Sequence, residues 1–268
     1  MSKYYNKLRR RFQKYYDRIY SYLYVLFFHD EETIKRLENR KFEELGFDIN
    51  SSLEKLNHLL QNKYNRNYNK YSDSIHWLVF SAISNQKHYR KILEIGTYDG
   101  EFTNMLGNLF PRSKITTVDL PKEDPLMASF YNRDESHLFQ QYIEKQNNNT
   151  NSKKIKVIKS NTFFLLNAIG DNEKFDLIWV DGGHLYPDIA WDLCNAYHLL
   201  NEGGMLLCDD VIMLDKKYKT RYVSTESWEV LKYMEKRINN RATYLLKRLD
   251  SALYSSKYSR KYVAVLKK

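Results

Sequence analysis

The sequence predicts an α/β fold: a doubly wound, mostly parallel seven-stranded sheet with helices on both faces. Short β-branched segments alternate with helical ones from residue 91 onward, which is typical of such a sheet. The first strand ends in a glycine turn, Glu94-x-Gly96-x-x-x-Gly100, and the second ends in Asp119, 25 positions after Glu94. Doubly wound folds bring an acidic residue to a ribose diol at about this interval.

The chain before residue 73 is predicted to form an N-terminal helical extension over residues 1–72. Residues 1 to 30 place basic, apolar and tyrosine side chains at mixed helical spacing, which fits an amphipathic helix. One or two further helices follow, broken at Gly46, and the polar run Gln61–Lys70 is expected to be a linker or loop. This extension is expected to pack on its own domain, to form a lid or a homodimer contact, or to lie on a membrane.

The domain proper is predicted over residues 73–268, and it begins with an apolar helix at 73–84. The expected strands are 91–95, 114–119, 154–160, 175–180, 205–208, 242–249 and 262–266. Helices are expected between them, including 185–200 and one from residue 225 to 235. The stretch 120–151, which ends in an asparagine-rich run, is expected to be exposed and to form a substrate loop.

The turn between Glu94 and Gly100 has the chemistry of a nucleotide-like site. Glycine lets the backbone approach a ligand closely and adopt torsions that a Cβ forbids, and the following helix directs its N-terminus at the bound group. The turn has only one glycine in its first half, unlike the Gly-x-Gly-x-x-Gly turn of dinucleotide enzymes.

Polar side chains end five of the predicted strands, and the carboxyl ends of parallel strands share one edge of the sheet. They are Glu94, Asp119, Ser160-Asn161-Thr162, Asp181 and Asp209-Asp210. Asp181, Asp209 and Asp210 would repel one another without a cation between them. Oxygen ligands favour Mg²⁺ or Mn²⁺ over zinc, so these three are candidate metal ligands; the alternative is that they cap turns or contact solvent.

His184 follows Asp181 by three residues. A histidine near its ordinary pKa can accept a proton at neutral pH, so His184 is a candidate general base. The alternatives are that it orients a metal ligand or that it is purely structural.

Together these motifs resemble class I S-adenosylmethionine-dependent methyltransferases. Asp181-Gly-Gly-His184 and the glycine turn before Asp209-Asp210 look like the metal-dependent branch that includes macrocin-type, cephalosporin-cluster and catechol-type O-methyltransferases. The resemblance covers roughly residues 73–268 and implies a final antiparallel strand pair. It also implies that Asp181 is catalytic together with His184.

The resemblance further implies a cofactor site. The residues expected there are Gly96 and Gly100 at the methionine part, Asp119 at the ribose and Asn161 at the adenine amine, together with Glu94, Thr97 and Asp181. Relatives often carry Asp-Ser where this chain has Asn161-Thr162.

Charge is unevenly distributed along the chain, which has a formal net charge of +10. Residues 1–72 carry 15 basic against 9 acidic side chains, residues 73–214 carry 13 against 19, and residues 215–268 carry 15 against 5. Basic flanks around an acidic centre favour an anionic partner, although scattered lysines also simply solvate a surface. Cys194 and Cys208 are expected to be reduced thiols, no apolar run reaches transmembrane length, and a cytoplasmic location is expected.

These observations predict methyl transfer from S-adenosylmethionine to a hydroxyl of a small polar acceptor, such as a sugar, a nucleotide-linked sugar or a secondary metabolite, assisted by Mg²⁺ or Mn²⁺. The acceptor is expected to be anionic. The alternative is an RNA-directed ribose methyltransferase or nucleic-acid-binding protein that uses the basic flanks; Asp181-Gly-Gly-His184 argues against base N-methylation. A third interpretation is an inactive scaffold held at membranes by the first 30 residues.

Overall fold

A seven-stranded sheet forms the centre of the computed structural model, which describes residues 31–129, 136–213, 225–250 and 260–268 with five isolated positions before residue 31. The strand order is β3-β2-β1-β4-β5-β7-β6. The strands are β1 Lys91–Ile95, β2 Lys114–Asp119, β3 Ile155–Lys159, β4 Phe175–Val180, β5 Leu200–Val211, β6 Thr243–Leu246 and β7 Tyr262–Lys267. Strand β7 runs antiparallel to β5 and β6, and the other pairs are parallel. The predicted fold class, including its antiparallel C-terminal pair, is confirmed.

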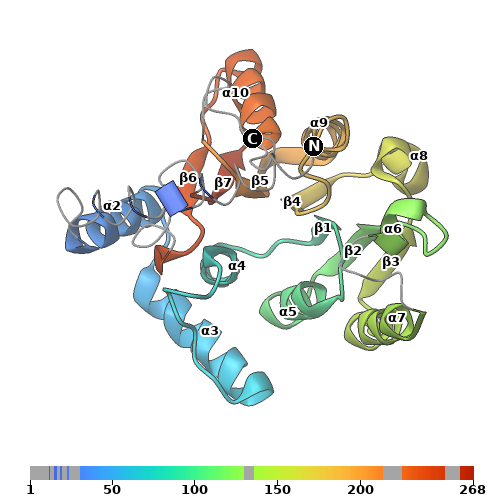
Figure 1. Ribbon diagram of the computed structural model, residues 1–268, viewed down its shortest axis with the longest axis horizontal. Helices are drawn as coiled ribbons and strands as arrows, with labels where there is room; N and C mark the ends of the chain where they lie inside the picture. The colour runs from blue at the N-terminus through green and yellow to red at the C-terminus, as the bar shows by residue number, and fades with distance from the viewer. Residues whose placement is uncertain are drawn as a thin grey trace.

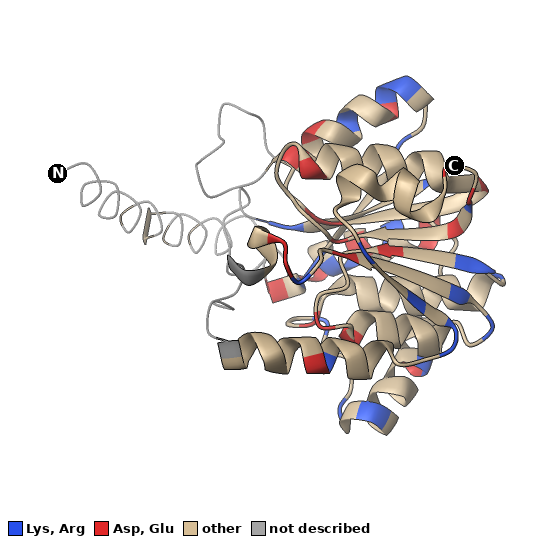
Figure 2. Cartoon of the chain, turned by 90° about the vertical axis from the view of Figure 1, so that its right-hand side faces the viewer, with Lys and Arg blue, Asp and Glu red and all other residues tan. Residues whose placement is uncertain are grey.

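Helices cover both faces of this sheet (Figures 1 and 2). They are α2 Glu31–Glu44, α3 Ile49–Tyr64, α4 Ile75–Gln86, α5 Glu101–Leu109, α6 Pro125–Ser129, α7 Ser136–Thr150, α8 Leu165–Ile169, α9 Asp188–Leu199 and α10 Glu226–Ile238, with a 3₁₀ turn η2 at Thr162–Phe164. Buried side chains of α2 to α5 form one core, and those of α8 to α10 form the other.

The two cores follow from the alternation of side chains along each strand. In β4, Leu177 and Trp179 belong to the core with α2 to α5, whereas Ile178 and Val180 belong to the core with α8 to α10. In β1, Ile92 belongs to the first core, and Leu93 and Ile95 belong to the second. Because β4 is buried on both faces, its residues 177–180 form a continuous apolar run, as is typical of parallel strands, and β1 is interrupted only by Glu94.

The N-terminal extension shares the first of these cores. Phe42 of α2 and both Leu56 and Leu60 of α3 are buried with residues of α4 and β1. The predicted linker or loop over 61–70 starts too early, because α3 continues to Tyr64; residues 65–70 are outside any helix or strand, and Tyr68 packs on the same core. The predicted amphipathic helix over residues 1 to 30 lies almost wholly outside the described residues.

The stretch 120–151 also differs from the expectation of an exposed loop. It contains α6 and the four-turn helix α7, whose last turns include the asparagine run. Gln146 and Thr150 of α7 are buried, and Asn104 of α5 donates a hydrogen bond to the Asn149 carbonyl (2.9 Å). The helix therefore docks through polar side chains, which a search for an apolar stripe does not detect.

Candidate active site

The turn after β1 is held where three strands end together. Gly96 donates its N–H to the Val118 carbonyl of β2 (2.9 Å), and the N–H of Asp181, at the end of β4, bonds the Ile95 carbonyl (2.8 Å). At Gly96 φ is +97°, and a Cβ there would overlap the backbone carbonyl of Asp181. Gly100 has φ +75° and caps α5. Both predicted glycines are therefore required by backbone conformation or by close approach.

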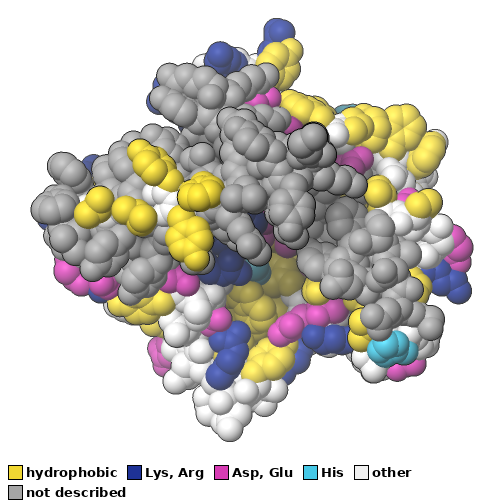
Figure 3. Space-filling view, in the orientation of Figure 1, with side chains coloured by type: hydrophobic (Ala, Val, Ile, Leu, Met, Phe, Trp, Pro, Cys, Tyr) yellow, Lys and Arg dark blue, Asp and Glu magenta, His cyan; other side chains and the backbone are white. Residues whose placement is uncertain are grey.

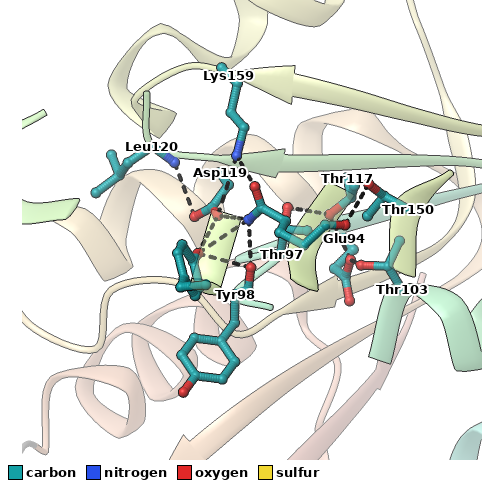
Figure 4. A network of polar contacts seen from close by, with 11 residues as sticks. Glu94, Thr97, Tyr98, Thr103, Thr117, Asp119, Leu120, Thr150 and Lys159 are labelled. Atoms are coloured by element: carbon teal, nitrogen blue, oxygen red, sulfur yellow. Dashed lines mark hydrogen bonds and ion pairs between the residues drawn. The ribbon is translucent and has the colours of Figure 1, made fainter. Parts of the chain in front are cut away.

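Glu94 and Thr97 lie underneath this turn. The Glu94 carboxylate is 1% exposed and accepts hydrogen bonds from the hydroxyls of Thr103 and Thr117, while the Thr97 and Thr117 hydroxyls are 2.6 Å apart (Figure 4). Burial, partly offset by these bonds, raises the pKa of Glu94 to about 8. Their side chains thus stabilise the turn from inside, whereas sequence reasoning assigned both residues to the cofactor.

Asp119 lies at the end of β2 and is enclosed by α7. Its Oδ1 accepts from the Leu120 N–H (3.0 Å), and its Oδ2 accepts from Gln146 Nε2 (2.6 Å) and the Tyr142 hydroxyl (3.2 Å). Lys159 Nζ is 3.7 Å from Oδ2, so three side chains converge on this carboxylate (Figure 4). Sequence reasoning proposed Asp119 but none of these partners; Gln146 and Tyr142 lie on α7, which was not predicted, and Lys159 ends β3.

Asn161 begins η2 after β3. Its side-chain oxygen accepts the Phe163 N–H (2.9 Å), so it acts as a helix cap. The Phe163 ring stacks edge-on against Trp191 of α9, with centroids 4.6 Å apart. This places an amide and an aromatic pair, of which Phe163 is exposed, beyond β3 and next to the strand end that carries Asp119.

Asp181, His184 and Asp210 meet at the ends of β4 and β5. His184 Nε2 is 3.6 Å from Asp181 Oδ1 and 4.0 Å from Asp210 Oδ2. Burial and the neighbouring Asp209 raise the pKa of Asp181 to about 6. Burial opposes protonation of His184, but its bond to Asp181 and the surrounding carboxylates give a net upward shift of its pKa.

The glycines of Asp181-Gly-Gly-His184 allow this loop to rest on α9. A Cβ at Gly182 would lie 2.7 Å from Asp192 Oδ2, and a Cβ at Gly183 would lie 2.8 Å from the Asp188 Cβ. Asp192 is 1% exposed, and neither of its oxygens has a hydrogen bond of good geometry among the described residues. Burial raises its pKa to about 7.

The carboxylate pair of β5 is engaged by lysines. Lys247 Nζ lies 2.5 Å from Asp209 Oδ2 and 2.5 Å from Asp210 Oδ1, and Lys261 bonds the other oxygen of Asp210. Asp210 has φ +52° at a break in the β5–β7 register between Cys208 and Val211, a bulge that re-aims its side chain. Burial opposes ionisation of Asp210, but the two lysines hold its pKa well below the usual range.

This arrangement does not fit the predicted divalent metal. The position between the Asp209 and Asp210 carboxylates is filled by the Lys247 ammonium. Within the described ranges, no three His, Cys, Asp or Glu side chains form a group that could hold a metal ion. Sequence reasoning found the carboxylates but not Lys247, which lies 37 positions beyond Asp210.

A hollow lies between α4 and α5 on the face viewed in Figure 3; hydrophobic side chains form its floor, with acidic and basic ones at its rim. The arrangement can therefore offer a glycine turn, a strand-end carboxylate, a histidine and a buried ammonium to ligands at the carboxyl edge of the sheet. This is the edge where open α/β sheets bind ligands.

Comparisons with known proteins agree with this architecture. A family model described as a methyltransferase domain matches residues 93–211. The O-methyltransferase from Bacillus cereus, solved with S-adenosylhomocysteine, is 17% identical with a TM-score of 0.52, covering 89% of this chain and all of that one. The O-methyltransferase TomG from Streptomyces achromogenes, involved in tomaymycin synthesis and solved with S-adenosylmethionine, is 14% identical with a TM-score of 0.52, covering 90% of this chain and 99% of its own.

A search of curated protein sequences finds no match. The family-model match over residues 93–211 and the shared fold confirm the resemblance to class I S-adenosylmethionine-dependent methyltransferases.

Proposed function

We propose that this chain uses its methyltransferase domain to transfer a methyl group from S-adenosylmethionine to a hydroxyl of a small polar acceptor. The observation that carries the proposal is the Gly96 turn, which leaves no room for a side chain between β1 and β4 and lies beside the Asp119 carboxylate. A backbone cradle next to a strand-end acid suits a nucleoside with a charged tail.

The residues of this edge fit the cofactor. The backbone from Gly96 to Gly100 would hold the methionine part, Asp119 the ribose hydroxyls, and Asn161 the adenine amine. A carboxylate has about four acceptor positions, and Asp119 uses three of them for Leu120, Gln146 and Tyr142. When both hydroxyls of a ribose bind Asp119, at least one of its hydrogen bonds from Gln146 and Tyr142 of α7 must therefore be replaced.

When bound, S-adenosylmethionine supplies an electrophilic methyl on a positively charged sulfur. His184 accepts the acceptor's hydroxyl proton at Nε2, and Asp181, 3.6 Å away, stabilises the resulting imidazolium. The oxygen–carbon bond forms as the carbon–sulfur bond breaks. The products are the methyl ether, S-adenosylhomocysteine and a proton, so charge and atoms balance.

The hollow of Figure 3 supports a small acceptor with both apolar and polar parts. A sugar, a nucleotide-linked sugar or a secondary metabolite has such parts, and the basic flanks favour an anionic one. Magnesium assistance, expected from the sequence, is not part of the proposal because Lys247 fills the cation position. RNA ribose methylation, homodimer formation and a cytoplasmic location stay predictions. Among the described helices, none is long and apolar enough to cross a bilayer.

The proposal is tested by incubating the purified chain with methyl-labelled S-adenosylmethionine and a panel of hydroxylated acceptors. We expect labelled ether and S-adenosylhomocysteine in equal amounts, and a loss of about 10²- to 10⁴-fold in kcat for His184→Gln. His198→Gln, a substitution of an exposed histidine on α9, serves as the matched control. Cofactor binding without turnover of any acceptor would contradict O-methyl transfer. An unchanged rate in His184→Gln would show that His184 is not the general base.

A further inference from the structure

We infer that the ammonium of Lys247 takes the place of a divalent cation at the ends of β4 and β5, and that it binds the acceptor oxygen during methyl transfer. The first half of this inference stands on the geometry alone. The second half rests on the proposed function.

Lys247 is a buried residue with two close carboxylate partners. It is 8% exposed, Asp209 is 2% exposed, and both carboxylates lie 2.5 Å from its Nζ. A buried ion pair of this kind is strongly destabilised when one partner is removed, because the other charge is left uncompensated. A divalent ion at the same position would have to displace the ammonium from both of its carboxylates.

The backbone of Lys247 is fixed on both sides. Its N–H donates to the Lys261 carbonyl (2.9 Å), and its carbonyl accepts the N–H of Ile75 at the start of α4 (2.8 Å). The adjacent Arg248 bonds the Ser72 carbonyl through Nε (2.8 Å). Lys247 is therefore placed by the end of β6 and by α4, in contrast to the freely rotating lysines of a surface.

Two bonding positions remain open at this site. An ammonium has three N–H donors, and the carboxylates of Asp209 and Asp210 take two of those of Lys247; the described residues offer no third acceptor. Asp209 Oδ1 is buried and has no hydrogen-bond partner among the described residues. A buried acceptor without a donor destabilises the folded state. Lys247 Nζ and Asp209 Oδ1 can therefore each form one more hydrogen bond with a ligand.

An acceptor with neighbouring hydroxyls satisfies both positions. The reacting oxygen accepts the third N–H of Lys247 while its proton passes to His184, and the neighbouring hydroxyl donates to Asp209 Oδ1. The positive ammonium stabilises the negative charge that develops on the oxygen, the electrostatic role that a metal otherwise performs. No proton leaves Lys247 in this step.

The cation position is tested by measuring Mn²⁺ binding, by calorimetry and by the spin-resonance signal of free Mn²⁺. We expect no site in the wild type at millimolar Mn²⁺, and binding at least about tenfold tighter in Lys247→Ala, because the ammonium between the Asp209 and Asp210 carboxylates is then gone. Asp209→Asn added to Lys247→Ala should abolish the gained site. Lys236→Ala, at an exposed lysine on α10, should behave like the wild type.

A Mn²⁺ site in the wild type at millimolar Mn²⁺ would overturn the inference, and this measurement needs no variant to fold. S-adenosylmethionine binding is measured on the same samples: its absence would refute the proposed function while leaving the Mn²⁺ result decisive for Lys247.

Once an acceptor is identified, Lys247→Met should lower kcat without weakening cofactor binding, and EDTA should leave wild-type turnover unchanged. Turnover that needs added Mg²⁺, or an unchanged kcat in Lys247→Met, would overturn the acceptor-binding half.

Discussion

Gly96 follows β1 and packs against the backbone of Asp181, the residue after β4. We predict that Gly96→Ala destabilises the fold more than Gly170→Ala, although both glycines have φ near +100°. At Gly170 nothing lies within 4 Å of an added Cβ, so alanine costs only the backbone strain of about 1–2 kcal/mol. At Gly96 the overlap with the Asp181 carbonyl adds roughly 1–3 kcal/mol. Urea unfolding of the two variants checks this; equal losses would show that the contact with β4 relaxes freely.

Asp192 gives a prediction for pH dependence. Its pKa rises from 3.8 to about 7 on folding because it is buried. Between these values the folded chain holds a proton that the unfolded chain releases, so the free energy of unfolding falls as pH rises from about 4 to about 7. Asp192→Asn removes this contribution. The variant should therefore gain stability relative to the wild type across this range, by a few kcal/mol in order of magnitude.

The measurement is the difference in unfolding free energy between wild type and Asp192→Asn at pH 4.5 and pH 8. Asp171→Asn, at an exposed aspartate before β4, is the control and should show no such difference. A stability gap for Asp192→Asn that does not change with pH would mean that Asp192 is ionised in the folded protein.

Individual site residues were predictable where the residue type itself carries the requirement. Gly96 and Gly100 have positive φ and Asp119 ends β2, as the pattern predicted, while their roles at a cofactor stay predictions. Glu94 and Thr97 were assigned to the cofactor, but strand alternation and burial turn their side chains beneath the turn. Lys247 could not be found, because nothing local in the sequence shows which of the chain's many lysines reaches the carboxylates of β5.

At the scale of elements, helix α3 belongs to the core of the domain and is not an appendage. We predict that Leu60→Ala, at a side chain with 0% exposure, lowers the unfolding free energy of the whole chain by about 2–5 kcal/mol in one cooperative transition. Leu37→Ala on α2, where the side chain is 51% exposed, should have little effect. A separate early transition in Leu60→Ala would show that the residues before 73 unfold independently.

The strands were easier to predict than the helices for a physical reason. Strands β1, β2 and β4 have the predicted bounds, since β-branched and apolar runs between polar turns leave little choice of register. Helix α7 was missed because its sequence is rich in asparagine and glutamine and its buried contacts include polar ones, such as Gln146 to Asp119. Polar docking of this kind depends on the partner element, which the local sequence does not contain.

On the scale of the whole molecule, charged side chains are spread over both helical layers, whereas the carboxylates of the candidate site lie together. Lys and Arg, and also Asp and Glu, occur on both helical layers (Figure 2), while the carboxylates of Asp119, Asp181, Asp209 and Asp210 gather at one edge of the sheet. Lysines compensate part of this acidity at Asp119 and Asp210. The site therefore presents paired charges rather than a bare acidic cluster, which suits a neutral or anionic acceptor better than a free cation.

Calorimetry of S-adenosylmethionine binding measures whether the carboxyl edge of this sheet holds the cofactor. We predict one site per chain in the wild type, binding weakened by roughly tenfold or more in Asp119→Ala because the ribose hydroxyls lose a charged acceptor, and unchanged binding in Asp171→Ala. Saturable heat in the wild type that is lost only in Asp119→Ala would support the account. No binding of S-adenosylmethionine or S-adenosylhomocysteine by the folded wild type would contradict it.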